Sequence, residues 1–384
     1  METLTPIQRI AVITIGLTLT AFIAVFVFPW AGEQIAARMP PAATPPPATH
    51  TPLPTAAPAE QAAPSPTPTV ALTPPPEFAL LEQVPHDSQA AGDNALASLS
   101  MALQYWGMQD TQEAIASSLR PGGQQDPSIE MAELAGYARS RGMLAYEGIN
   151  GNIQVLRQLV ANGFPVIIAR WYTTTEGIET WQYQVVHGYD HPAEMLVLHD
   201  ASAGPGIAVS YSDADSAWQA LHRPYLTVLP AEQMALAQAI LETDEGEPSM
   251  WDRALARAER ELDADAESAF AWLNKASALV ALGRSAEAGE AFDRAEEIGL
   301  PAGLMEYRLE YDEYLLDMQE YDRLLTLTQA AADGGTSQEQ IYLLRAEAYI
   351  ALGDAAKARA EYGRALQVRP GWSPAANGLS GLPE

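Results

Sequence analysis

The chain has 384 residues, with 49 acidic and 21 basic side chains and a formal net charge of −28. That charge argues against a nucleic-acid partner, because binding to phosphate backbones requires clustered Lys and Arg. The sequence contains no cysteine, which excludes disulfides, thiolate metal sites and any thiol nucleophile.

The first predicted element is a membrane-spanning helix. Residues 10–30 contain no charged side chain and would extend about 31 Å as a helix, which matches the hydrocarbon core of a bilayer. A cleaved signal peptide is the alternative, but its apolar region is usually about 7–15 residues long. Arg9 precedes the run. We therefore expect residues 1–9 to stay in the cytoplasm and the soluble domains to be extracytoplasmic, as in a single-pass protein of the cell membrane.

Residues 31–76 are predicted to be a disordered linker. Fourteen of the 29 prolines lie between Pro40 and Pro76, and most of the other residues there are Ala and Thr. Proline removes backbone donors and the apolar side chains are too small to build a core, so we expect an extended segment. The stretch from Pro40 to Pro76 alone would hold the following domains away from the bilayer by up to about 115 Å, at roughly 3.1 Å per residue.

Residues 77–230 have the pattern of a mixed α/β domain. Apolar residues at helical spacing predict four helices, and short apolar runs predict the strands that follow them. The first strand is a continuous apolar run, which indicates a central position in a sheet. Residues 204–206 (Gly-Pro-Gly) are predicted to form a turn. The predicted helices are Asn94–Trp106, Thr111–Leu119, Ser128–Arg141 and Asn152–Asn162, and the predicted strands are Pro165–Ala169, Gln182–Gly188, Met195–His199 and Tyr225–Leu229.

Residues 231–384 are predicted to be helical throughout and to contain a repeat. Seven residues from Trp272 to Ala295 recur from Tyr342 to Ala365 with an offset of 70, or two periods of 35. The period and the positions of the small residues resemble the helix–turn–helix units of tetratricopeptide repeats. The copy between them is degenerate: its corresponding positions carry bulk where Ala and Gly are expected, and they are Tyr311, Tyr314, Met318, Leu327 and Ala330. The resemblance implies an all-α tetratricopeptide-repeat domain.

The α/β region resembles a peptidase family. Gln89 is followed by Asn94 at the head of a helix that ends in Tyr-Trp-Gly, and the run 182–190 (Gln-Tyr-Gln-Val-Val-His-Gly-Tyr-Asp) is followed by Asp200. In order and spacing, these segments resemble the papain-like family that includes the bacteriocin-processing (double-glycine leader) cysteine peptidases. The resemblance covers about residues 80–230 and implies an α+β papain-like fold.

The same resemblance implies which positions would carry the chemistry. The nucleophilic Cys of the family corresponds to Asn94 and its base His to Gln182, whereas its oxyanion Gln and orienting Asp are kept as Gln89 and Asp200. An amide is not a usable nucleophile and cannot exchange a proton near neutral pH. We therefore predict a pseudo-peptidase that is not an enzyme.

A rewired hydrolase is an alternative that the residues leave open. Ser98 lies one helical turn beyond Asn94, and His187 could serve as its base. However, side chains alternate along a strand, which would direct His187 away from the side of Gln182.

A metal site is a further alternative. Three histidines and two aspartates fall in or near the strands, but their spacing fits no tight chelate. We therefore predict no metal and no cofactor. These residues are His187, His191, His199, Asp190 and Asp200.

A peptide-binding groove is the function that the papain-like cleft could keep. Trp181 and Tyr183 flank Gln182, and we expect them at the mouth of the cleft, where the amides of Asn94 and Gln182 could hydrogen-bond a bound backbone. The alternative places these aromatic residues in the core.

The repeats also favour a binding function. From residue 231 onward, 13 basic and 29 acidic side chains favour cationic partners, and repeat arrays present concave surfaces to peptides and proteins. We predict a membrane-anchored, extracytoplasmic protein that binds peptides or partner proteins, with a structural spacer as another alternative. Because few contacts usually cross a domain boundary, we expect the two domains to unfold separately.

Overall fold

The computed structural model describes residues 72–90, 94–120, 129–173, 179–241 and 249–382. The predicted cytoplasmic tail, membrane span and most of the linker lie outside these ranges. Within them, every helix is either too short or too polar to cross a bilayer. The membrane anchor and the linker therefore stay predictions.

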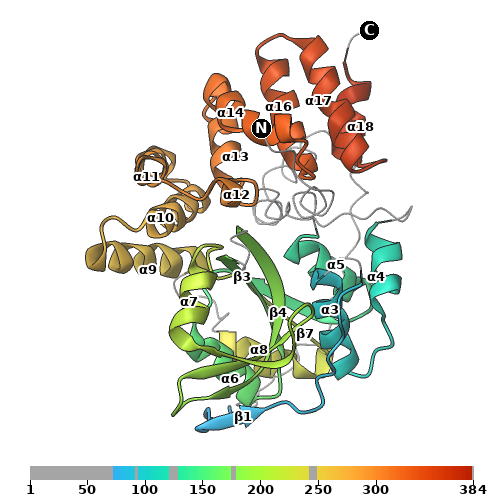
Figure 1. Cartoon of the computed structure of the whole chain (residues 1–384), viewed down its shortest axis with the longest axis vertical. Coiled ribbons are helices and arrows are strands. Elements are labelled where there is room, and N and C mark those ends of the chain that lie inside the picture. The colour runs from blue at the N-terminus through green and yellow to red at the C-terminus, as the bar shows by residue number, and fades with distance from the viewer. Residues whose placement is uncertain (1–71, 91–93, 121–128, 174–178, 242–248, 383–384) are drawn as a thin grey trace, which may run out of the picture.

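The described strands form one seven-stranded antiparallel sheet (Figure 1). The strands are β1 (Phe78–Leu80), β2 (Leu144–Gly148), β3 (Val166–Thr173), β4 (Glu179–Asp190), β5 (Met195–Asp200), β6 (Gly204–Ser210) and β7 (Tyr225–Leu229). Their order is β2-β7-β3-β4-β5-β6, and β1 pairs with the end of β4. The apolar strand β3 lies between β7 and β4, as its sequence predicted.

Helices cover both faces of this sheet. On one face they pack against the odd-numbered residues of β3 and β4, such as Ile167 and Val185, and on the other against even-numbered ones such as Ile168 and Val186. This alternation is the two-residue period of a strand buried on both sides. The first group is α3 (Asn94–Tyr105), α4 (Gln112–Leu119) and α5 (Met131–Ser140), and the second is α6 (Ile153–Ala161), α7 (Tyr211–Gln219) and α8 (Met234–Leu241), preceded by the short 3₁₀ helix η1 (Ala231–Gln233).

The four predicted helices of this domain are confirmed, and side-chain caps explain two of their starts. Thr111 accepts a hydrogen bond from the backbone of Ala114, and Asn152 accepts one from Val155, so each satisfies an orphan donor of the first turn. The predicted turn at residues 204–206 is wrong, because these residues already belong to β6. The chain reverses earlier, at residues 201–203.

Strands β1, β2 and β6 and helix α7 were not predicted. Their sequences are short, half exposed or polar, so neither a helical nor a strand periodicity marks them.

The C-terminal part is helical, as predicted. Its helices are α9 (Met250–Ala264), α10 (Ala269–Ala281), α11 (Ser285–Ile298), α12 (Ala302–Met305), α13 (Glu310–Asp317), α14 (Tyr321–Leu327), α15 (Gln329–Gly334), α16 (Glu339–Ala351), α17 (Ala355–Val368) and α18 (Ser373–Ser380). The pairs α10–α11 and α16–α17 are the two well-marked repeats. Gly283 and Gly353 turn between their helices with φ of +72° and +80°, a conformation that favours glycine.

The degenerate middle copy is shorter and bulkier than its neighbours. Its helices α13 and α14 contain 8 and 7 residues. The Tyr314 hydroxyl approaches α11 so closely that a Cβ on Gly289 would lie 2.4 Å from it. Bulk in the middle copy is therefore accommodated by glycine in the preceding repeat.

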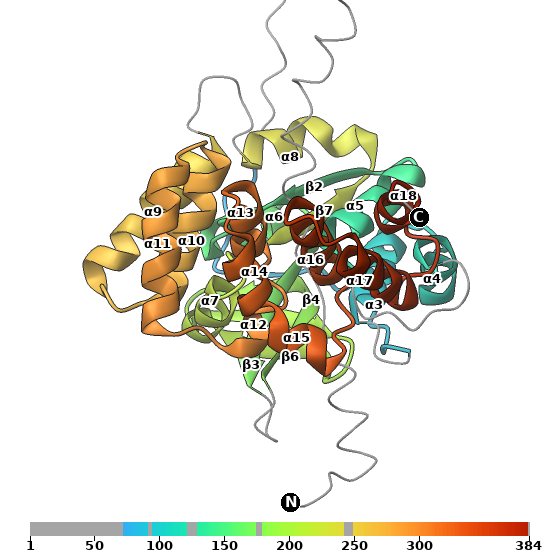
Figure 2. The ribbon, with the colours of Figure 1, turned by 90° about the horizontal axis from the view of Figure 1, so that it is seen from above.

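The repeats arch over one end of the α/β domain, from α9 to α18 (Figure 1), and α12 lies next to β4 (Figure 2). The expectation of few contacts between the domains is wrong. One continuous cluster of buried apolar residues includes Trp171 and Trp181 of the sheet together with Leu273, Phe292 and Tyr307 of the repeats. The first repeat and the middle copy therefore share a hydrophobic core with the α/β domain. The last repeat has a separate core around Tyr342 and Tyr362, although Leu344 and Ala348 of α16 belong to the continuous cluster.

Buried polar contacts join the same two parts. The fully buried Arg308 donates from Nη1 to the carbonyl of Ala220, at 2.7 Å, and from Nε to Glu310 in α13, at 2.8 Å. Arg223, which is 4% exposed, forms an ion pair with Glu261 of α9 at 2.8 Å. Buried charges cost free energy unless they are paired, so these pairs hold the two parts in one arrangement.

Candidate functional site

Asn94 reaches strand β4 beside Gln182, the residue that the resemblance assigns to the base. Helix α3 begins at Asn94, and its side-chain Oδ1 accepts a hydrogen bond from the backbone N–H of Tyr183 at 2.8 Å. Tyr183 directly follows Gln182. The head of the helix and the middle of β4 therefore meet as the resemblance implies.

Gln182 is turned toward Asp200 and contacts it through a serine. Its Nε2 donates to Ser202 Oγ at 2.9 Å, and Ser202 Oγ lies 2.9 Å from Asp200 Oδ1. Asn94 and Gln182 make no hydrogen bond to each other, although both are described. The two residues that the resemblance assigns to the nucleophile and the base, Asn94 of α3 and Gln182 of β4, therefore lie near each other without forming a hydrogen-bonded pair.

Asp200 is held by protein donors on both carboxylate oxygens. Oδ1 accepts from the backbone N–H groups of Ser202 and Ala203, both at 2.8 Å, and Oδ2 accepts from Gln184 Nε2. Gln184 in turn accepts from Arg170 Nε at 2.6 Å. The carboxylate therefore closes the turn between β5 and β6 and needs no histidine partner.

Gln89 lies in the same neighbourhood. Its backbone N–H donates to the carbonyl of Ala201 at 2.9 Å, which places it beside Asp200. Its side-chain Oε1 is buried and has no hydrogen-bond partner among the described residues. The structure thus gathers Gln89, Asn94, Gln182 and Asp200 around the end of β5. The first three are amides, which supply neither a nucleophile nor a base, and the carboxylate of Asp200 is already held by protein donors.

Trp181 and Tyr183 are buried and do not line an open cleft mouth. They are 8% and 2% exposed. The Trp181 ring packs edge-on against Tyr183 at 4.9 Å and against Tyr307 of the repeats at 5.3 Å. Trp181 and Tyr183 therefore lie in the core, which was the alternative to the cleft mouth, because the repeat domain covers this part of β4.

The histidines pack against each other beside β1. The rings of His187 and His199 stack at 3.8 Å, and burial, together with His199, lowers the pKa of His187 to about 4. His187 is therefore neutral near pH 7. In the described part of the chain, no group of three or more His, Asp or Glu is arranged to hold a metal.

The serine–histidine alternative also lacks its geometry. Ser98 is fully buried in α3, and its Oγ has no hydrogen-bond partner among the described residues. His187 Nδ1 lies near the carbonyl of Leu81. A general base must reach the hydroxyl that it deprotonates, so these two residues do not form a catalytic pair.

Sequence reasoning missed three residues that decide this geometry: Gln184, Ser202 and Tyr307. Ser202 follows Asp200 by two positions, a spacing at which an Asp side chain commonly accepts from the backbone. That signal could have predicted the turn. Gln184 and Tyr307 carried no signal, because only the fold brings them to Asp200 and Trp181.

The protein families that match this chain agree with this architecture. Residues 81–225 match the Peptidase_C39 like family, and residues 271–298 and 339–371 match tetratricopeptide repeats. A crystal structure described as a C39-like peptidase from Bacillus anthracis aligns with 18% identity, covering 40% of this chain and 97% of that chain, with a TM-score of 0.32. No curated protein gives a significant match.

The chain therefore contains a C39 peptidase-like domain followed by tetratricopeptide repeats. The two repeat matches coincide with the two well-marked copies, and the degenerate copy lies between them. Because the chain has no cysteine, the nucleophile of a C39 cysteine peptidase is absent.

Proposed function

We propose that this protein is a non-hydrolytic binding protein in which the C39-like domain supports the repeats and the repeats bind a protein partner. The observation that carries the proposal is the packing of Tyr307 on Trp181, in a chain without a cysteine nucleophile. The strand that would present a catalytic base is covered by the repeats. A peptidase needs that region open to its substrate.

The same contact supports the repeats, in preference to the papain-like groove, as the binding surface. A peptide in the papain-like groove would have to touch Trp181 and Tyr183, whose rings are already buried by the chain itself. Binding there by Asn94 and Gln182 would require Tyr307 to move away. Repeat helices, in contrast, bind partners on surfaces that stay exposed in the folded protein, so we place the partner on the repeats.

We also propose that the chain is anchored in the cell membrane with residues 77–384 outside the cytoplasm. The uncharged run at residues 10–30 and the proline-rich segment that follows support this arrangement. It would present the repeats at a distance from the bilayer.

The full-length protein in detergent tests the proposal in two arms. In the first, peptides with a double-glycine leader are incubated with the protein and followed by mass spectrometry; we expect no cleavage, and turnover above that of buffer would favour the rewired hydrolase. In the second, an array of unrelated peptides is probed for binding. Binding of a definable peptide class supports the proposal, and binding of none would favour a purely structural spacer.

A further inference from the structure

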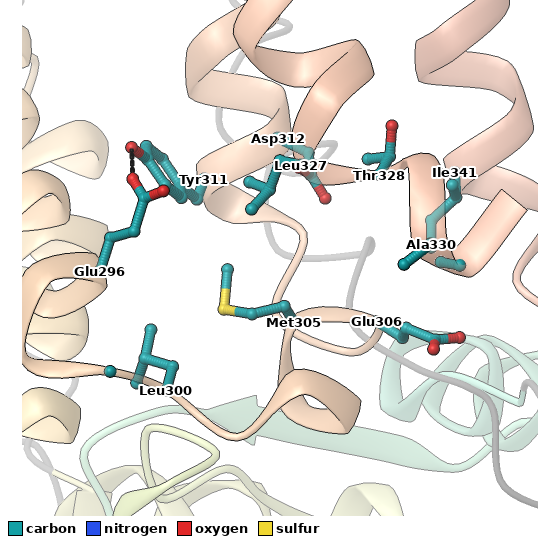
Figure 3. Close-up of a pocket in the computed structure, with 12 residues that line it drawn as sticks. Glu296, Leu300, Met305, Glu306, Tyr311, Asp312, Leu327, Thr328, Ala330 and Ile341 are labelled. Atoms are coloured by element: carbon teal, nitrogen blue, oxygen red, sulfur yellow. Dashed lines mark hydrogen bonds between the residues drawn. The ribbon is translucent and has the colours of Figure 1, made fainter.

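A cavity of about 380 Å³ opens in the degenerate middle copy, where α11, α13, α14, α15 and α16 meet the segment after α12 (Figure 3). That volume is within the range of specific ligand sites. The residues that line it are Glu296, Gly299, Leu300, Met305, Glu306, Tyr311, Asp312, Leu327, Thr328, Ala330, Ala331 and Ile341.

The cavity has an exposed rim, apolar walls and a buried floor. Glu296 and Ala330 are exposed at the rim. Leu300 and Met305 are half-buried along the walls. The floor is buried, with Asp312 only 2% exposed. A ligand that enters would pass along hydrocarbon before its far end reached a carboxyl group.

Asp312 has no partner at the end of that path. Its Oδ1 is buried and makes no hydrogen bond within the described chain. Figure 3 shows the carboxyl group and the Met305 side chain turned toward the same space. A buried polar atom without a partner costs free energy of folding, so the fold carries an unsatisfied acceptor aimed into a cavity.

The charged residues among those that line the cavity are all acidic: Glu296, Glu306 and Asp312. Glu296 is already neutralised, because it accepts from the Tyr311 hydroxyl at 2.9 Å and from Arg323 Nη2 at 2.5 Å. Asp312 has no such cation. Its neighbour Arg308 pairs with Glu310.

The pKa shifts of Asp312 and Glu306 agree with a site in which no cation balances the charge of the ionised acids. Burial, and next the charge of Glu310, raises the pKa of Asp312 well above its ordinary value. Burial also raises the pKa of Glu306. A carboxyl group of this kind holds its proton until a cation stabilises the ionised form.

We propose that this cavity receives a basic side chain, lysine or arginine, of the protein partner, with the stem along Leu300, Met305 and Leu327 and the cationic head at Asp312. Both side chains have an apolar stem and a cationic end, which is the order of surfaces from rim to floor. The inference rests on the proposed function, because it supplies the chemistry by which the repeats would choose a partner.

The test uses two small probes with the full-length protein. Nα-acetyl-lysine methylamide carries the apolar stem and the side-chain ammonium group, and Nα-acetyl-norleucine methylamide carries a similar stem without the charge. We expect saturable binding of the lysine probe by ligand-observed NMR and at least about tenfold weaker binding of the norleucine probe. Equal binding of the two probes would overturn the role of the charge.

The Asp312→Asn variant keeps the shape and removes the charge, and Glu313→Gln is its matched control. Glu313 follows Asp312 in α13, and its pKa is also raised well above the ordinary value by burial, but it does not line the cavity. We expect Asp312→Asn to weaken lysine binding at least about tenfold and Glu313→Gln to leave it within about twofold. Equal loss in both variants, in proteins that melt as the parent does, would refute the site.

The peptide array separates failure of this inference from failure of the proposed function. Peptides that bind equally well to the parent and to Asp312→Asn would refute the pocket and leave the binding function in place. If the array shows no binding at all while the lysine probe still binds in an Asp312-dependent way, the proposed function fails and the cavity is a site for small cations alone.

Discussion

Replacement of Tyr307 by Ala tests whether the C39-like domain and the first repeats fold as one unit. The Tyr307 ring is 1% exposed and packs edge-on against Trp171 at 5.5 Å and Trp181 at 5.3 Å. Truncation of a buried aromatic residue to Ala costs about 3–5 kcal/mol. Of that, two edge-on aromatic pairs at about 0.5–1.5 kcal/mol each account for about 1–3 kcal/mol.

The absence of cysteine gives a direct assay, because one introduced thiol reports on one place in the fold. Ser98→Cys marks the C39-like domain and Ala276→Cys marks the first repeat; both positions are fully buried. Each thiol becomes reactive toward a maleimide when its surroundings unfold in urea. We expect Tyr307→Ala to lower both midpoints together, by about 1 M or more if the denaturant slope is about 3 kcal/mol per M.

Tyr342→Ala is the matched control. Tyr342 is 3% exposed, but it belongs to the separate core of the last repeat. We expect it to leave the Ser98→Cys midpoint nearly unchanged. If Tyr307→Ala shifts only the thiol in the repeat, the shared core does not couple the two parts, and the original expectation of separate unfolding would be right.

Further outcomes are expected from the same structure. Ala358→Trp, at a fully buried position in α17, should destabilise the last repeat by about 1–3 kcal/mol through overpacking, and an unchanged melting curve would contradict the predicted helix contact. In Asn94→Cys with Gln182→His, iodoacetamide rates against pH should give a thiol pKa below the ordinary value of about 8.5, because a helix N-terminus and an imidazolium at position 182 together stabilise the thiolate. Neither single change should suffice, and an ordinary pKa in the double variant would show that these are not the nucleophile and base positions. Protease added to intact cells should release a fragment by cutting in the proline-rich segment, whereas complete protection until lysis would place the domains in the cytoplasm. Asp312→Asn should raise stability at pH 8 and lose that gain as the pH falls toward 4. The pKa of Asp312 is higher in the folded than in the unfolded chain, so the cost of ionising Asp312 destabilises the fold increasingly as the pH rises. The nearby acids Glu310, Glu296 and Glu306 are present in both the parent and the variant. A gain in stability that does not depend on pH would therefore contradict a role for the charge of Asp312.

The repeats could be predicted from sequence because their signal is local. Gly283 and Gly353 occupy turns with positive φ, and Ala288 and Ala358 occupy fully buried positions in the second helix of each repeat. The turn conformation and the helix packing each restrict the residue type at one position, and these positions recur at a fixed spacing along the chain. A period of 35 residues therefore reveals the fold directly.

The surface between the domains could not be predicted in the same way. Tyr307 lies outside both well-marked repeats, and its contacts with Trp171 and Trp181 join residues more than 120 positions apart. No spacing rule relates such residues. From the sequence alone, aromatic side chains such as Trp181 and Tyr183 are equally compatible with a cleft and with a core. Only the fold shows which part of the chain covers them.

Two buried aspartates, Asp200 and Asp312, differ in whether the protein satisfies their carboxyl groups. The resemblance assigns Asp200 to the orienting acid of the family, yet backbone N–H groups, Ser202 and Gln184 satisfy its carboxylate, and such a carboxylate can be explained by its turn alone. Asp312 has no donor in the described chain, and its burial destabilises the fold. A carboxyl group that costs stability is expected where a ligand completes it. A binding function is therefore expected at the cavity of the degenerate repeat, and not in the region that corresponds to a peptidase cleft.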